Sequence, residues 1–251
     1  MRVTQAWTTT MQSLADNPDV RTVTNAASIP GILGTIATLL RDHDGSNPEM
    51  LEYALNGAYQ IIYALLDAQL ESPDEEDDSE SAIGNQAKAM VQSVRGLYAS
   101  AANRKELDRR RGKVLELLVY RRIAELYVDG DCQMDCSVTG NNAYYHNLKG
   151  REFDVCAWDE NRLMGEAYEC AVRPYGLVYR DCTALITLTK AVKEDYADED
   201  NEPWFRVGLV SFEHSRNMRA RIRKLAGTEA EREEFTMIEA FGWDNLDTIA
   251  Q

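Results

Sequence analysis

Three carboxylic acids interrupt segments of this sequence that are otherwise rich in apolar residues. Asp154 lies in the run REFDVCAW, Glu169 in LMGEAYECAV and Glu116 in GKVLELLVY. Burying an ionised carboxylate is costly unless a cation or hydrogen-bond donors accompany it. A divalent metal ion is one such partner, because Mg²⁺ and Mn²⁺ bind carboxylate and carbonyl oxygens. The chemistry that this set of residues offers is metal-assisted hydrolysis.

The spacing around Glu169 places further groups beside it. Positions two apart in a β-strand point to the same face, so Glu169 and Ala171 share a face of the expected strand. The backbone carbonyl of Cys170, between them, can complete the oxygen ligands of a metal ion. Glu166 is expected to point to the opposite face from Glu169, which gives it a structural role.

Each acid also has a structural alternative. Glu116 belongs to a helical face that is otherwise apolar, where a salt bridge to an arginine or lysine would satisfy it as well as a metal ion. Asp154 could end a strand and accept backbone N–H groups, and Glu169 could pair with Arg173 at an exposed position. These alternatives place the same acids in the fold without a metal site.

The elements that must position the acids follow one another as helix, three strands, helix and strand. We expect the first helix at 103–130, the strands at 132–138, 151–158, 163–172 and 204–213, and the second helix at 181–200 with Asp181 as its N-cap. This order is typical of a compact α/β unit. The segment 141–152 is expected to be a loop or hairpin that lies near the substrate.

The remainder of the chain is expected to be helical. The predicted ranges are a helical N-terminal region for assembly or partner binding at 1–100, the α/β core at 101–215 and a helical tail at 216–251. Within the first range, helices are expected at 28–45 and at 47–71, the second of them with Asn47 as its N-cap. The acidic run ESPDEEDDSES (71–81) predicts a solvated linker.

Composition and charge limit the function classes. The chain has 251 residues, 44% of them hydrophobic, and a net charge of −15, which argues against a free-standing, nonspecific nucleic-acid binder. A nuclease is compatible with this charge, because metal-binding acids add negative charge and the basic segments 103–113 and 214–224 can form a rim that contacts phosphates. No apolar run is long enough to span a membrane and no signal peptide is recognisable, so we expect a cytoplasmic protein with no membrane partner.

The five cysteines are expected to be reduced thiols, most of them buried. A zinc-binding module is the alternative, although the chain lacks the paired CxxC spacing that would indicate it.

The acids and the order of elements in residues 104–213 resemble the PD-(D/E)xK nuclease superfamily, which has the restriction-endonuclease-like fold. Asp154 is similar to the metal-binding Asp of that family, Glu169 to the first acid of its (D/E)xK element, and Glu116 to the acid on its first helix. The resemblance implies an α/β core with a mixed central sheet and flanking helices, holding Mg²⁺ or Mn²⁺. It also implies an endonuclease acting on DNA, with RNA as the alternative substrate.

The resemblance further implies a biological setting. Members of this family often serve as effector subunits of prokaryotic restriction or antiviral defence complexes. The expected partners are therefore further copies of the same chain, or an ATPase or sensor subunit.

The sequence departs from the family pattern at Ala171, where the family has a lysine that orients the attacking water or stabilises charge. Three explanations stay open: a deliberate Lys→Ala replacement, transfer of the role to Lys190 or Lys193 on the following helix, or natural loss of activity. The last of these makes the chain a non-catalytic scaffold or interaction subunit with a decayed nuclease fold.

Overall fold

The structure is a computed structural model that describes residues 1–6, 9–69, 76–197 and 202–250. The chain divides into two compact units: residues 13–114 form one, and residues 1–12 together with 115–251 form the other. These units differ from the expected ranges 1–100, 101–215 and 216–251. The reason is that both the first and the last segments of the chain contribute strands to one sheet.

The first unit is helical. Its helices are the last part of α1 (Thr9–Ala15), then α2 (Pro18–Ala27), α3 (Leu33–Asp42), α4 (Pro48–Asp67), α5 (Glu76–Ala99) and the first part of α6 (Arg104–Ala124). Asn47 caps α4 as predicted, because its side chain accepts the N–H of Met50 at 3.1 Å. Among the described residues, no helix combines the length and the apolar character needed to span a membrane.

Two expectations about these helices are wrong in their limits. Of the predicted linker 71–81, residues 71–75 lie outside the described residues, whereas residues 76–81 form the first turns of α5. The helix predicted at 103–130 ends at Ala124, six residues before the glycine expected to end it.

The second unit is α/β and contains, in its described residues, a mixed sheet of six strands. The strands are β1 (Arg2–Gln5), β2 (Asp131–Thr139), β3 (Phe153–Asp159), β4 (Met164–Ala171), β5 (Trp204–Ser211) and β6 (Ile238–Phe241), in that spatial order. Neighbours from β1 to β4 are antiparallel, whereas β5 is parallel to β4 and β6 to β5. The parallel pairs require crossover connections, which are helical.

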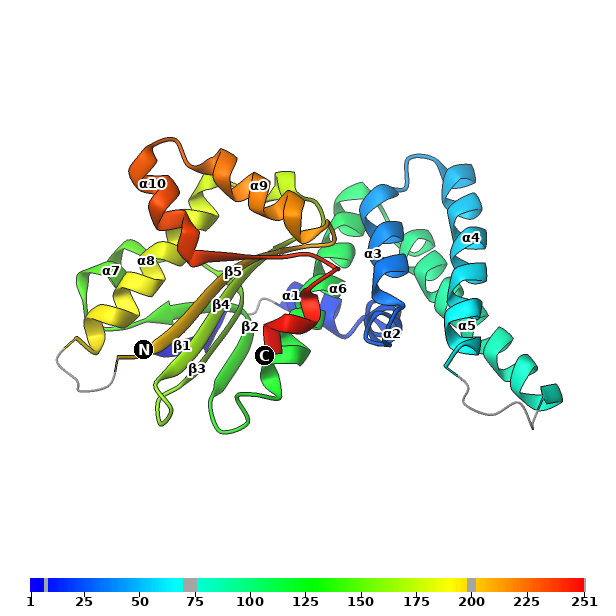
Figure 1. Cartoon of the computed structure of the whole chain (residues 1–251), viewed down its shortest axis with the longest axis horizontal. Coiled ribbons are helices and arrows are strands. Elements are labelled where there is room, and N and C mark those ends of the chain that lie inside the picture. Colours follow the sequence, from blue (N-terminus) through cyan, green and yellow to red (C-terminus); the bar gives the residue numbers. More distant parts are fainter. Residues whose placement is uncertain (7–8, 70–75, 198–201, 251) are drawn as a thin grey trace. The chain divides into compact units, whose positions relative to one another are not determined.

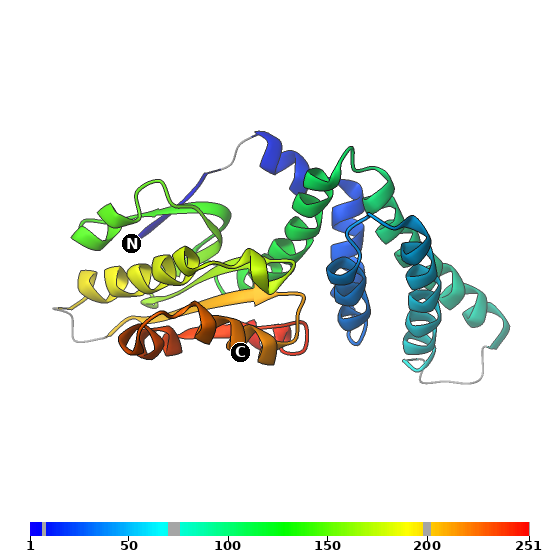
Figure 2. The ribbon, with the colours of Figure 1, turned by 90° about the horizontal axis from the view of Figure 1, so that it is seen from above.

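Helices cover one face of this sheet. The helices that follow the central strands are α7 (Ala143–Asn147), α8 (Tyr179–Asp195), α9 (Ser215–Leu225) and α10 (Glu229–Glu234), with short 3₁₀ turns η1 (Pro174–Gly176), η2 (Phe235–Met237) and η3 (Leu246–Ala250). Leu185 and Leu188 of α8 and Met218 of α9 share one buried cluster with Ala167 of β4 and Leu209 of β5. Helix α8 therefore packs on β4, which carries Glu169, and on β5, whereas α9 packs on β5 and β6 (Figures 1 and 2).

The structure corrects four further expectations in this unit. Residues 2–5 and 238–241 were expected to be helical, but they form β1 and β6, which pair with strands far away in the sequence. The expected loop at 141–152 contains the short helix α7. Helix α8 begins at Tyr179, so Asp181 is the third residue of the helix and not its N-cap.

Candidate functional site

The candidate site lies where β3 and β4 separate. The antiparallel pairing of these strands runs from Asp159 and Met164 to Val155 and Tyr168. Just beyond the last pair, the carboxylate of Asp154 accepts the backbone N–H of Cys170 at 2.6 Å. The Asp154 side chain thus accepts a backbone N–H of β4 at a point where the β3–β4 pairing has ended. This is the structural alternative considered for Asp154, and it fixes the carboxylate against β4.

Glu169 lies beside this junction and is almost completely buried, with 6% of the residue exposed. Burial raises the pKa of Glu169 to about 7. The positive charge of Arg151 opposes that rise, the carboxylate of Asp181 adds to it, and a hydrogen bond with Asp154 opposes it. Asp154 and Glu169 are cross-strand neighbours, because each lies one residue beyond the last pair, Val155 and Tyr168, on adjacent strands.

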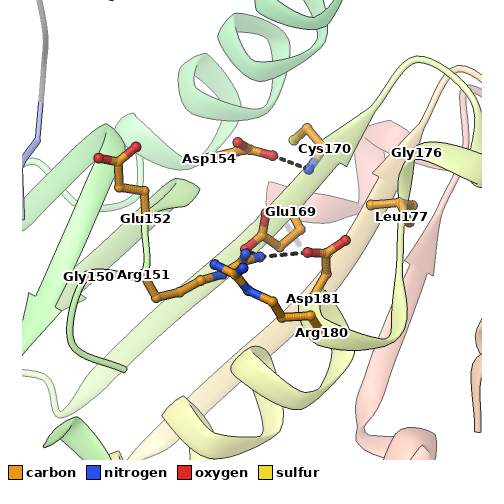
Figure 3. A pocket seen from close by; sticks show the side chains of 10 residues that line it. All are labelled: Gly150, Arg151, Glu152, Asp154, Glu169, Cys170, Gly176, Leu177, Arg180 and Asp181. Atoms are coloured by element: carbon orange, nitrogen blue, oxygen red, sulfur yellow. Dashed lines mark hydrogen bonds and ion pairs between the residues drawn. The ribbon is translucent and has the colours of Figure 1, made fainter. Parts of the chain in front are cut away.

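Arg151 is the cation of this cluster. Its Nη2 donates to Oε1 of Glu169 at 2.5 Å and to Oδ1 of Asp181 at 2.7 Å (Figure 3). The expected partner of Glu169, Arg173, is not the one found. Arg151 Nε is buried and has no hydrogen-bond partner among the described residues.

Asp181 is held by the start of α8. Its Oδ2 accepts the N–H of Val178 at 2.8 Å, while its Oδ1 accepts from Arg151. One carboxylate thus stabilises the first turn of the helix and anchors the guanidinium at the same time. The sequence indicated only the first of these roles, because Arg151 and Asp181 are thirty residues apart in the chain.

These groups line a pocket of about 480 Å³. Figure 3 shows Arg151, Glu169 and Asp181 pointing toward one another, with Asp154 and Cys170 together on the neighbouring strands. The remaining lining residues are Gly150, Glu152, Gly176, Leu177 and Arg180. The guanidinium of Arg180 is exposed and forms no ion pair with any described residue, so the pocket carries a second cation.

Two predicted site residues lie outside this lining. Glu116 is half-buried on α6 and is not among the residues that line the pocket, so its part in a metal site stays a prediction. Ala171 ends β4 opposite Ser211, and a Cβ built on Gly176 would lie 3.0 Å from its methyl group. Since Gly176 lines the pocket, a longer side chain at 171 would start at its edge.

Neither lysine proposed as a replacement lies in the pocket lining. Lys190 Nζ is 2.8 Å from a carboxylate oxygen of Glu234, and Lys193 Nζ is 2.8 Å from one of Glu202. Both ammonium groups are paired on the surface of α8. The positive charges within reach of the acids are arginines.

Some arginines of the two basic segments have internal roles. In the first, Arg110 pairs with Glu106, and Arg111 donates to the backbone carbonyl of Leu40 at 2.7 Å. In the second, Arg221 Nη2 donates to the carbonyl of Leu177 at 2.8 Å, which fixes the turn that lines the pocket. These arginines are engaged within the fold, whereas Arg216, Arg219, Arg223 and Lys224 of the second segment are exposed, and the phosphate-contacting rim stays a prediction.

Glu166 contacts a different set of residues from Glu169. The hydroxyl of Tyr168 donates to its carboxylate, and burial raises its pKa. Glu166 has 1% of its surface exposed and does not line the pocket. Its contacts agree with the structural role expected from strand alternation.

The donor atoms partly fit a divalent ion. Asp154, Glu169 and Cys170 line the same pocket and supply two carboxylates and a backbone carbonyl. However, no three His, Cys, Asp or Glu side chains among the described residues are grouped so as to hold a metal ion. Two further acids line the pocket: Glu152, which is exposed, and Asp181, which is paired with Arg151. The five cysteines are free thiols, of which Cys132 and Cys170 are half-buried and the others buried.

No protein-family model, no curated protein and no solved structure matches the chain.

Proposed function

We propose that the α/β unit is a metal-dependent nuclease domain whose metal-binding acids are Asp154 and Glu169. The observation that carries this proposal is the placement of these two acids side by side in one pocket, where β3 and β4 separate and the N–H of Cys170 donates to Asp154. Acids of this kind in a buried junction are expected where a cation binds.

The order of the elements supports the same proposal. Helix α6 is followed by the antiparallel strands β2, β3 and β4, then by α8 and by β5, which is parallel to β4. This is the arrangement that the resemblance to the PD-(D/E)xK superfamily implies, with the two acids on its second and third strands. The restriction-endonuclease-like core is part of the proposal.

The chain's own residues divide the work at the pocket. A Mg²⁺ or Mn²⁺ ion bound by Asp154, Glu169 and the carbonyl of Cys170 would polarise the scissile phosphate and acidify a bound water. Arg151 and Arg180 supply positive charge for the phosphate oxygens. Asp181 holds Arg151 in position through its own bond to the start of α8.

Arg151 can supply the positive charge that the family lysine would supply at position 171. Alanine at 171 removes the ammonium that the family pattern has, and Lys190 and Lys193 are paired elsewhere. Arg151 approaches Glu169 from the chain segment before β3 and brings a fixed positive charge to the same acid. In this proposal Arg151 provides the positively charged side chain of the site in place of a lysine at position 171.

The substrate in this proposal is DNA, with RNA as the alternative that the experiment below distinguishes. The helical unit of residues 13–114 serves assembly, either with further copies of the chain or with an ATPase or sensor subunit of a defence complex. This setting rests on the family resemblance.

One observation favours a second function, a non-catalytic interaction subunit. Arg151 neutralises Glu169 and Asp181 at once, and Ala171 leaves the family position without a charge. A decayed nuclease would have this arrangement if Arg151 had replaced the metal ion permanently.

The two functions are separated by metal binding and cleavage measured on the same variants. Wild type, Asp154→Asn and Glu169→Gln are titrated with Mn²⁺ by calorimetry and incubated with supercoiled plasmid or single-stranded RNA. The exposed Glu194→Gln, on α8, is the matched control. We expect saturable Mn²⁺ binding and plasmid nicking in wild type and the control, and loss of both in the two site variants.

Ala171→Lys resolves the remaining case. Cleavage that arises only with this lysine shows that the fold is a nuclease inactivated at position 171. Mn²⁺ binding that is absent in wild type, or unchanged in both site variants, overturns the proposal in favour of the interaction subunit.

A further inference from the structure

A second cavity of about 500 Å³ lies in the α/β unit, among α9, α10, β6 and η3. It shares no lining residue with the pocket that contains Glu169. Figure 1 shows α9 and α10 together above the strands. The volume is in the range of pockets that hold small organic ligands.

Three arginines line this cavity. Arg219 and Arg223 are four residues apart on α9 and so share a helical face, while Arg232 comes from α10. None of the three guanidinium groups has an ion pair or hydrogen bond with any described residue. Acidic residues outnumber basic ones by 42 to 27 in the chain, so three unpaired cations at one place run against the overall charge.

The acid that lines the cavity does not neutralise these arginines. The carboxylate of Glu239 lies 3.4 Å from Nε of Arg206 and is thus already paired. Like charges held together raise the electrostatic potential of the cavity, and an anion relieves their repulsion. The planar guanidinium matches the oxygens of a phosphate in pairs, which favours phosphate over a simple halide.

The rest of the lining is apolar or can accept hydrogen bonds. Ile222, Phe235 and Phe241 are buried and contribute apolar surface. The hydroxyls of Thr236 and Thr248 donate to backbone carbonyls, which leaves their oxygens as acceptors. The cavity thus offers cations for an anionic group, apolar surface for a flat group, and acceptors for N–H or O–H donors.

We propose that this cavity binds the 5′-phosphate of a nucleotide, with Arg219, Arg223 and Arg232 around the phosphate and the base against the apolar lining. The nucleotide is either free or the 5′ end of a nucleic acid strand, since both present the same chemistry. This site is independent of the proposed nuclease site, because it uses none of its residues.

The test is calorimetric titration of the full chain with adenosine 5′-monophosphate, adenosine, inorganic phosphate, and a dinucleotide with and without a 5′-phosphate. We expect saturable binding of the monophosphate, with adenosine and inorganic phosphate each weaker by about 10-fold or more. The double variant Arg219→Gln/Arg223→Gln should lose about 10-fold or more in affinity, since it removes two charged donors.

The matched control is Arg216→Gln, an exposed arginine on α9 that does not line the cavity, which should bind as wild type does. Circular dichroism checks that each variant is folded. Tighter binding of the 5′-phosphorylated dinucleotide than of the monophosphate assigns the phosphate to a strand end, and the reverse order assigns it to a free nucleotide.

Three results with the ligands and the double variant overturn the proposal. They are equal affinity for adenosine and its monophosphate, equal affinity for inorganic phosphate and the monophosphate, and an unchanged affinity in the folded double variant. Binding that is lost in the control as strongly as in the double variant also overturns it, because charge on α9 in general would then explain it.

Discussion

Glu169 should make the stability of the α/β unit depend on pH. Burial raises the pKa of this carboxyl from 4.5 to about 7, against the opposing charge of Arg151. In the unfolded chain the same group titrates near its ordinary value. Between these two values the folded protein therefore binds a proton that the unfolded chain has released.

The size and sign of the effect follow from this shift. One pKa unit corresponds to about 1.4 kcal/mol, so the shift amounts to roughly 3 kcal/mol of the free energy of unfolding. Because the pKa of the acid is raised, this stability is complete below about pH 4.5 and is lost as the pH rises through about 7. Glu169→Gln removes the titrating group, so the variant should not show this decrease in the free energy of unfolding as the pH rises.

The measurement is urea unfolding of wild type and Glu169→Gln across that pH range, with a chelator present to remove metal ions. Tryptophan fluorescence reports on the α/β unit, because residues 13–114 contain no tryptophan. The difference in unfolding free energy between the two proteins should change by roughly 3 kcal/mol in favour of the variant between about pH 4.5 and about pH 8. Parallel pH profiles for the two proteins would refute the burial of Glu169 as the cause.

Three further predictions concern the same unit. Arg151→Gln leaves two buried carboxylates without their cation, so it should lower the unfolding free energy by about 3–5 kcal/mol in the absence of metal. Part of this stability should be regained when Mn²⁺ is added. An equal loss with and without Mn²⁺ would argue against a metal site. Gly165→Ala places a Cβ 2.6 Å from the Trp158 ring and 2.8 Å from a backbone oxygen. It should lower the free energy of unfolding, measured in urea, by about 1–3 kcal/mol. The control Gly57→Ala has open space around it in α4 and should be neutral or stabilising. Burial raises the pKa of the Cys182 thiol to about 12, so this thiol should react with Ellman's reagent far more slowly in the native protein than in urea; equal rates would show that it is exposed.

The sequence predicts the elements whose signals are local. Asn47 followed by proline marks the start of α4, and the apolar runs around Asp154 and Glu169 give β3 and β4 within two residues of their ends. In these cases the cap or the strand pattern lies within the element itself. The two acids could be singled out for the same reason, because each interrupts an apolar run.

The sequence cannot predict what depends on distant partners. Strand β1 has four residues and exists because it pairs with β2, more than a hundred residues later in the chain. The sequence offers Arg173, close by on the same segment, as a partner for Glu169, whereas the fold brings Arg151 to Glu169 from another segment. Asp181 joins the site for the same reason, since only the packing of α8 on β4 brings it there.

The binding of a metal ion at the junction of β3 and β4 is tested most directly by anomalous diffraction from crystals of the chain grown with Mn²⁺. The account predicts an anomalous peak between the carboxylates of Asp154 and Glu169, with the guanidinium of Arg151 withdrawn from Glu169. A map in which Arg151 still bridges Glu169 and Asp181, with no peak at these acids under saturating Mn²⁺, would contradict it.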